Sequence, residues 1–225
     1  MRLVINMDET GSTFDIPCST TVNQKGAQHV NVKSTNNSGS LTVFLACALD
    51  GSKLTPMVVF KGQPGKTVEK GFTTAGNRYD RRVVCCVQEN NYCDERVMLL
   101  WIEKVLRPYL ATMDPGICLF MMDNFAPHQK KSVRCALATL NCLQVMLPPN
   151  MTSRVQMLDV GVNKPFKDRM KHCYREHMLD EIEDNATKVK ITRELMTEWI
   201  ADSYEGVPSS AIKNTARKIG FIDEE

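Results

Sequence analysis

The chain has 225 residues, a formal net charge of +2 and 24% charged residues. This length is enough for one domain of generous size, or for a domain with an appended lobe, and for a substantial buried core. No apolar stretch approaches the roughly 20 residues that a helix needs to cross a bilayer, and residues 1–15 carry Arg2, Asp8 and Glu9 instead of a signal-peptide pattern. We therefore expect neither a membrane-spanning segment nor a targeting peptide.

The chain contains nine cysteines, an odd number, and no Cys-x-x-Cys pair. Most of them lie inside apolar runs, which is typical of reduced core thiols in an intracellular protein. The nearest approach to a zinc site is His172-Cys173 with His177, but this group lacks a second pair of ligands. We therefore predict neither a disulfide framework nor a zinc centre.

The first 60 residues predict a three-strand meander, followed by a short fourth strand. These strands are expected near residues 2–7, 28–33, 40–49 and 57–60. Residues 61–82 are rich in Gly, Lys and Arg and have little periodicity, so we expect them to form a loop. Within this loop, residues 62–67 (GQPGKT) resemble a phosphate-binding P-loop. That motif requires a glycine where the chain has Phe60, and the stretch does not open a convincing helix, so we predict no nucleotide site.

Helices and strands alternate in the second half of the chain. Asp94 is expected to cap a helix over residues 94–110, which Pro108 would kink or end. The remaining elements are expected at 83–87 (strand), 117–122 (strand), 129–140 (helix), 143–147 (strand), and 163–181, 191–205 and 209–219 (helices). This order predicts an α/β fold, a ribonuclease H-like mixed sheet flanked by helices. We assign residues 1–182 to this core and residues 183–225 to a C-terminal helical extension.

Three aspartates follow predicted strands. Asp8 ends the first apolar run, Asp123 ends the continuous apolar run 117–122, and Asp159 follows the strand at 143–147. Ligands in open α/β sheets gather outside the carboxyl ends of the strands, so these side chains are expected to meet at one sheet edge. Carboxylate oxygens suit Mg²⁺ or Mn²⁺ better than softer metals. The three aspartates are thus candidates for a two-metal phosphoryl-transfer site.

Two basic stretches flank these candidate ligands. Residues 61–82 contain six cations and two anions, and a second basic run covers residues 164–175. Such stretches are often only solvated faces, but beside metal carboxylates they also suit a phosphate backbone. The candidate DNA contacts are Lys61, Lys66, Arg81, Arg82, Lys164 and Lys167.

Several short blocks, taken together and in order, carry a family resemblance. They are NMDET (6–10), VKST (32–35), FKG (60–62), MDN (122–124) with His128, LPPNMTS (147–153) and LDVGVNKPFK (158–167). In these blocks the chain resembles the catalytic domain of the pogo and Tigger transposases, within the DDE superfamily endonucleases. The separation between Asp123 and Asp159, 35 intervening residues, falls within the range that such families use.

The resemblance implies a metal-dependent endonuclease that cuts and joins DNA at transposon ends. Asp8, Asp123 and Asp159 would hold two Mg²⁺ ions, with Mn²⁺ as a substitute, and Asn124 and His128 would support the site. The same resemblance implies DNA as partner, a homo-oligomer in a synaptic complex, and a nuclear location. Glu9 is expected to be a solvated neighbour of Asp8, because successive strand residues point to opposite faces.

The chain also departs from the family pattern. Gln156 is followed by Met157 where the family commonly has Gln-Pro. Family members usually carry helix-turn-helix domains before the catalytic core, whereas this chain begins almost at the first catalytic strand. One alternative is therefore a domesticated or decayed module that binds DNA or protein and keeps the fold without catalysis. Another is a ribonuclease H-like nuclease that acts on a different nucleic acid.

Overall fold

The computed structural model describes residues 3–16, 35, 37–113, 116–149, 151–183 and 189–222. Its described strands form one mixed sheet in the order β4-β3-β2-β1-β5-β6. The strands are β1 (Leu3–Thr13), β2 (Ser40–Ala48), β3 (Met57–Lys61), β4 (Val84–Gln88), β5 (Cys118–Met122) and β6 (Cys142–Met146). Only β2 runs against its neighbours, so the carboxyl ends of the other five strands share one edge. This order confirms the predicted mixed sheet.

The first strand is longer than predicted. β1 does not end before Asp8 but continues to Thr13, and it pairs with β2 from Ile5↔Ala48 to Thr13↔Ser40. The apolar residues of β2 are buried on both faces of the sheet, and this long neighbour supplies backbone partners for the polar half of β1. The antiparallel meander is therefore β1-β2-β3. The strand expected at 28–33 lies outside the described residues.

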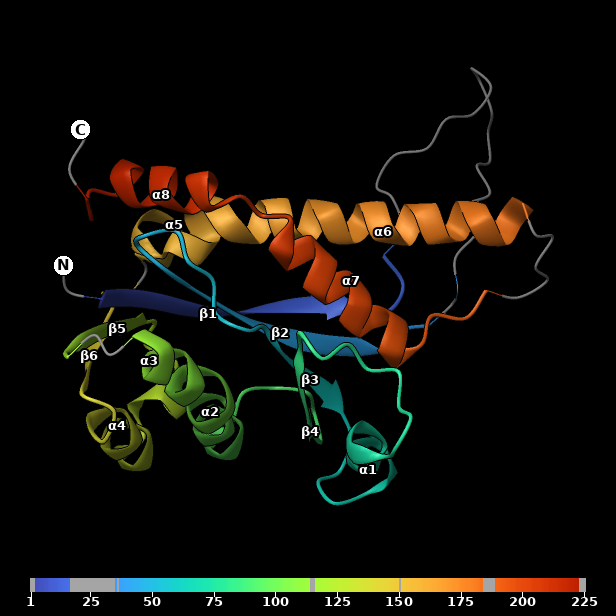
Figure 1. Ribbon diagram of the computed structural model, residues 1–225, viewed down its shortest axis with the longest axis horizontal. Coiled ribbons are helices and arrows are strands. Elements are labelled where there is room, and N and C mark those ends of the chain that lie inside the picture. Colours follow the sequence, from blue (N-terminus) through green and yellow to red (C-terminus); the bar gives the residue numbers. More distant parts are fainter. Residues whose placement is uncertain are drawn as a thin grey trace.

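Helices cover both faces of the sheet (Figure 1). One face carries α2 (Glu95–Trp101), α3 (Arg107–Met113) and α4 (Lys131–Ala138), and the other carries α5 (Thr152–Val155), α6 (Asn163–Glu183), α7 (Arg193–Glu205) and α8 (Ser209–Lys218). Among the described helices, none is both long and apolar enough to span a bilayer.

Each face of the sheet has its own apolar core. Phe60 and alternate residues of β2 pack with Phe166 of α6 and with Trp199 and Ile200 of α7. On the opposite face, Trp101 stacks on Phe120 with ring centroids 5.4 Å apart. The C-terminal helices thus complete the core on one face of the sheet. The division of the chain after residue 182 stays a prediction.

The helix after β4 contains an unexpected π-helical segment. The Asp94 cap is confirmed, since its carboxylate accepts from Val97 N at 2.8 Å. Pro108 was expected to kink or end this helix, but helical structure continues to Met113. The segment Ile102–Leu106 has π geometry, with Arg107 N bonded to Ile102 O, and this wider turn lies just before the proline. Its position fits a local adjustment to the missing proline donor. The helix ends three residues beyond the predicted Leu110, and Pro108 does not end it.

The basic segment 61–82 also differs from expectation, because it contains a short helix, α1 (Thr67–Thr73). Gly65 N donates to the Glu69 carboxylate at 2.5 Å, which supplies a partner at the helix start. Phe72 packs near Phe60 and against Tyr79, with ring centroids 6.1 and 4.9 Å away. The helix therefore forms where Phe72 can reach Phe60 of the sheet. The periodicity of the local sequence does not reveal this contact.

Gly161 allows α8 to approach the segment before α6 closely. A Cβ atom at this position would lie 1.9 Å from Thr215 Oγ1 and 2.9 Å from its Cβ. We expect Gly161→Ala to lower the free energy of unfolding by about 2 kcal/mol, because overpacking forces the two segments apart. Urea unfolding measures this loss. Thr215→Gly in the same chain removes the clash and is expected to recover part of the lost free energy of unfolding. If the losses of the two single variants simply add in the double variant, the packing argument is contradicted.

Candidate metal centre

Asp8 and Asp159 converge on a shared partner, Asn163. The Asn163 amide donates from Nδ2 to Asp8 Oδ2 at 2.9 Å and to Asp159 Oδ1 at 3.1 Å. Asp8 comes from the middle of β1, whereas Asp159 and Asn163 come from the junction of a π-helical turn, Leu158–Val162, with α6. The structure thus brings together two of the three aspartates that the sequence predicted, through a residue to which the sequence assigned no role.

Buried polar side chains fix this π-helical turn to the sheet. Asn6 donates to Met121 O at 3.2 Å and accepts from Leu158 N at 3.3 Å, so it links β1, β5 and the turn. Gln156 donates to Met7 O at 3.4 Å. Both side chains are almost fully buried, at 0% and 1% exposure. Since a buried amide without partners would be costly, these contacts hold Asp159 at a defined place beside β1.

The Asp8 carboxyl lies in an unfavourable place for a bare negative charge. Burial and the charge of Asp159 raise its pKa to about 7, although the Asn163 hydrogen bond opposes this shift. Among the described residues, Asn163 Oδ1 is buried and lacks a hydrogen-bond partner. Two carboxylates and an unpaired amide oxygen are hard donors, so the residues present fit a divalent cation such as Mg²⁺.

Asp123 lies at the same edge of the sheet. The parallel pairing of β1 with β5 ends at Asn6↔Met121, and Asp8 and Asp123 each follow two residues later. The Asp123 carboxylate accepts from Phe125 N at 3.1 Å and contacts His128 Nδ1 at 2.8 Å. Its side chain is 31% exposed. Asp123 is therefore held in position from one side while remaining open to solvent.

His128 joins Asp123 to Glu9. Its ring is 1% exposed, with Nδ1 2.8 Å from Asp123 and Nε2 3.0 Å from Glu9 Oε1. Burial alone would lower the pKa of His128, but the hydrogen bonds to Asp123 and Glu9 outweigh it and raise this pKa to about 10. The ring is thus a cation that donates from both nitrogens. Its hydrogen bond in turn lowers the pKa of Asp123 and keeps that carboxylate ionised.

The prediction that Glu9 is merely solvated was therefore wrong. Glu9 does point away from Asp8, as strand alternation requires, but the opposite face of β1 is covered by helices instead of water. Its side chain is only 15% exposed. Ligand-type atoms of Glu9, Cys93 and His128 lie within 4.8 Å of one another. Burial raises the pKa of the Cys93 thiol, and the charge and hydrogen bond of the Glu9 carboxylate raise it further. Glu9, Cys93 and His128 therefore form a hydrogen-bonded cluster behind Asp123.

Asn124 supports the loops more than the carboxylates. Its amide donates to Leu147 O at 2.7 Å and so ties the loop after β5 to the end of β6. Gln129 donates to Asn124 O at 2.9 Å. The first residues after both strands are thereby held together next to Asp123, and the supporting role of Asn124 at the site stays a prediction.

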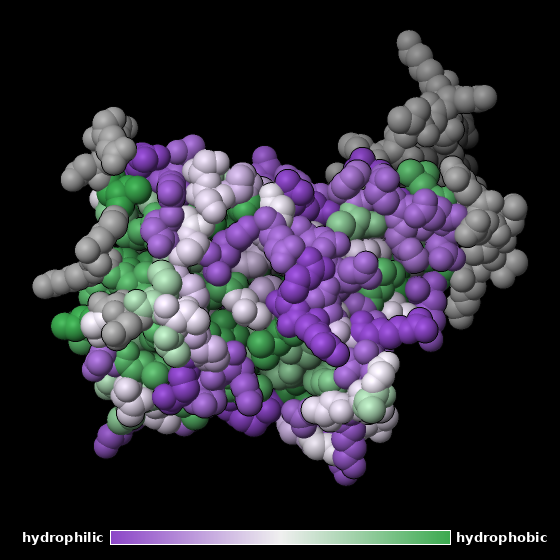
Figure 2. Space-filling model, viewed as in Figure 1, coloured by the Kyte–Doolittle hydropathy of each residue, from purple (hydrophilic) through white to green (hydrophobic). Residues whose placement is uncertain are grey.

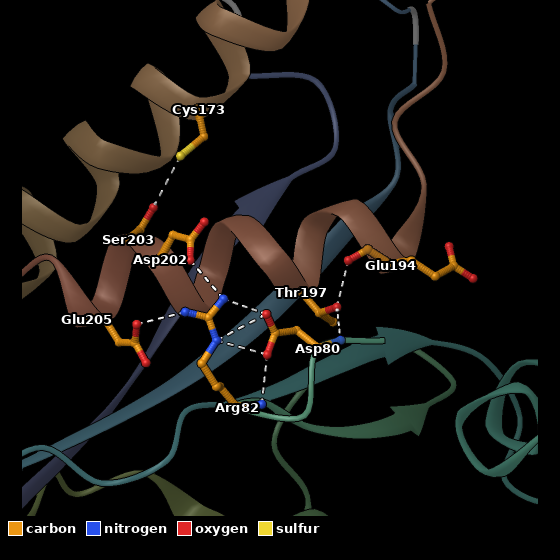
Figure 3. A network of polar contacts seen from close by, with 8 residues as sticks. All are labelled: Asp80, Arg82, Cys173, Glu194, Thr197, Asp202, Ser203 and Glu205. Carbon is orange, nitrogen blue, oxygen red and sulfur yellow. Dashed lines mark hydrogen bonds and ion pairs between the residues drawn. The ribbon is translucent and has the colours of Figure 1, made fainter. Parts of the chain in front are cut away.

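The candidate DNA contacts fall into two groups. All six are exposed; the first group is Lys61, Lys66, Arg81, Lys164 and Lys167. Arg82 instead bonds to three carboxylates, Asp80 at 2.6 Å, Asp202 at 2.8 Å and Glu205 at 2.7 Å, and thereby clamps the segment before β4 to α7 (Figure 3). The surface over α7 is mostly hydrophilic (Figure 2). With its charge compensated, Arg82 is a structural residue here and not a free cation for phosphate.

Solved structures with a similar fold include complexes of the Mos1 transposase. The chain aligns with "Mos1 transposase paired-end complex with left transposon end" at a TM-score of 0.58 and 14% identity, covering 96% of this chain and 52% of that one. The "mariner Mos1 paired end complex with Mg" aligns at a TM-score of 0.59 and 12% identity, over 97% and 52% of the two chains. The fold is therefore ribonuclease H-like, as in these structures.

Residues 38–215, more than half of the chain, match the model of the DDE superfamily endonuclease family. The chain belongs to the DDE superfamily endonucleases. It is 26% identical over 220 residues to the "Pogo transposable element with KRAB domain" of Mus musculus, an alignment that covers 95% of this chain. It is also 24% identical over 160 residues to the "Pogo transposable element with ZNF domain" of Homo sapiens, which covers 71% of this chain. The chain spans 34% and 11% of the length of these two relatives. The predicted pogo resemblance is thus confirmed.

Proposed function

We propose that this chain is a divalent-metal-dependent DNA endonuclease and strand-transfer core of the pogo type. The observation that carries the proposal is the convergence of Asp8 and Asp159 on Asn163, with Asp123 at the same edge of the sheet. In this proposal the three aspartates hold two Mg²⁺ ions, and Mn²⁺ can replace them. The mariner complex with Mg supports this cofactor by its likeness in fold.

The protein residues have distinct tasks in the proposed reaction. Asn163 spaces Asp8 from Asp159, and His128 keeps Asp123 ionised and oriented. When bound, the two metal ions supply the Lewis acidity that activates an attacking water or DNA 3′-hydroxyl and stabilises the leaving oxygen. The aspartates then need not act as bases, since their role is to bind the two metal ions and to fix the positions of these ions.

The proposed substrate is duplex DNA at transposon ends. The exposed cations Lys61, Lys66, Arg81, Lys164 and Lys167 would contact its phosphates, and such contacts weaken as salt rises. A nuclear location and a homo-oligomeric synaptic complex belong to the same proposal. Both rest on the pogo relatives and on the paired-end complexes that the similar structures contain.

Mn²⁺ binding tests the site without requiring DNA recognition. We expect saturable binding in calorimetry and electron paramagnetic resonance, and a loss of at least about tenfold in affinity in Asp123→Asn and Asp159→Asn, because each removes a charged ligand. Asp168→Asn, an exposed carboxylate on α6, is the matched control and should bind normally.

The two site variants should also lose any metal-dependent nicking of DNA that the parent chain shows. Mn²⁺ binding that neither variant changes would contradict the assignment of the site. Normal nicking by Asp123→Asn would contradict its catalytic role.

A further inference from the structure

A groove lies along the last residues of β1, beside α6. It has a volume of about 400 Å³ and lies between the last residues of β1, the start of β2, the loop after β4 and α6. Its lining includes small side chains of β1, namely Gly11, Ser12 and Thr13, and the longer side chains Tyr92, Lys167 and Lys171. Small residues thus form the sheet side of the groove, and its walls carry an aromatic ring and two cations.

β1 and α6 link the groove to the proposed metal ligands. β1 carries Asp8 and then Ser12 four residues later, a distance of roughly 13 Å along a strand. α6 runs beside it, with Asn163 bonded to Asp8 and with Lys167 one helical turn further on. A chain that leaves the metal centre along β1 and α6 would therefore reach the groove.

Tyr92 is presented to the groove by an ordered backbone. Its side chain is 67% exposed, the largest exposed fraction among the described large hydrophobic residues. The preceding Asn91 is buried and has φ of 53°, a left-handed conformation that few residues other than glycine adopt. Asn91 Oδ1 accepts from Ser40 at 3.4 Å, and Tyr92 N donates to Gln88 Oε1 at 3.2 Å. These contacts involve Asn91 and the backbone of Tyr92, and they hold the ring toward solvent. A polar side chain at position 92 would leave the same contacts intact.

We infer that this groove binds an unpaired stretch of the DNA strand next to the cleavage site. Tyr92 stacks on a base, and Lys167 and Lys171 contact the adjoining phosphates. An aromatic face can stack only on a base that has left its duplex stack, which is why the occupant is a single strand and not a duplex. Lys171 lies 3.7 Å from Asp168, so Lys167 provides the larger share of the attraction. This inference rests on the proposed function and adds the local form of its substrate.

Binding of a short single-stranded oligonucleotide in EDTA tests the groove without catalysis. In fluorescence anisotropy at low salt, we expect Tyr92→Ala to weaken binding about tenfold, because stacking is worth about 1–3 kcal/mol per base. Tyr92→Phe keeps the ring and should bind within about twofold of the parent. Lys167→Gln should weaken binding and lower its salt dependence.

Two variants control for changes in exposed apolar area and in charge. Leu143→Ala removes an apolar side chain that is 57% exposed on β6, and Lys104→Gln removes an exposed cation on the opposite face of the sheet. Both should bind the oligonucleotide as the parent chain does. A 2-aminopurine base in the oligonucleotide should be quenched by the parent and by Tyr92→Phe, but not by Tyr92→Ala.

The groove inference is overturned if the parent chain does not bind the single strand, or if Tyr92→Ala binds and quenches as the parent does. Mn²⁺ titration of the same proteins separates this result from a failure of the proposed function. Normal Mn²⁺ binding with no stacking would reject the groove alone. If the parent chain does not bind Mn²⁺, the metal centre itself is rejected.

Discussion

Asp8→Asn is expected to stabilise the metal-free protein at pH 8 by up to about 4 kcal/mol while abolishing tight Mn²⁺ binding. The pKa of Asp8 is about 7 in the folded chain, against an ordinary value of 3.8, because of burial and the charge of Asp159. Between these two values the folded chain holds a proton that the unfolded chain has lost. Stability therefore falls as pH rises from about 4 to about 7, and asparagine removes this loss.

Urea unfolding in EDTA at pH 5 and pH 8 measures this effect. The stability difference between Asp8→Asn and the parent chain should grow from pH 5 to pH 8, whereas the control Asp168→Asn should show no such growth. Mg²⁺ at 100 times its dissociation constant should narrow this difference at pH 8, because only the parent gains binding energy, about 2.7 kcal/mol. An equal difference at both pH values would show that Asp8 ionises normally in the folded chain.

His128→Ala is expected to destabilise the protein by about 3–5 kcal/mol at pH 7, the range for removing one partner of a buried charged group. The change leaves Glu9 and Asp123 without their shared donor. The pKa of His128 is raised to about 10, so its contribution is complete below about pH 6.5 and is lost as pH rises through about 10. The cost of the variant should therefore be smaller at pH 10 than at pH 7.

Urea unfolding again supplies the measurement, and His172→Ala is the control because that side chain is 67% exposed. Adding Glu9→Gln to His128→Ala should recover part of the loss, since it removes one of the two carboxylates left without a donor. Mn²⁺ affinity should fall in His128→Ala because Asp123 is no longer held. A variant as stable as the parent chain would show that the two carboxylates do not depend on His128.

The sheet was predictable because its strands are encoded by local apolar runs. The stretches before Asp123 and in β2 are continuous and bounded by turn residues, so their type and order follow from the sequence alone. The length of β1 was not predictable in this way. Its polar half is a strand only because β2 pairs with it, and that pairing joins residues far apart in the chain.

The carboxylates of the candidate metal centre could be singled out from the sequence, but their supports could not. Asp8, Asp123 and Asp159 stand out because each follows an apolar run. Asn163, Asn6 and Glu9 act through contacts more than 100 residues away along the chain. Strand alternation does place Glu9 on the face of Met7 and Ile5, and the apolar character of those neighbours was the one available sign that this face is covered.

The π-helical turn Leu158–Val162 fixes the rotational phase of α6 relative to Asp159. A helix advances about 100° per residue, so removing one residue from this turn would rotate everything beyond it by about that angle. Phe166 and Met170 would then leave the core, or Asp159 would leave the metal centre. This short stretch can therefore accept substitutions at its exposed positions, but its length is fixed by the two surfaces that it joins.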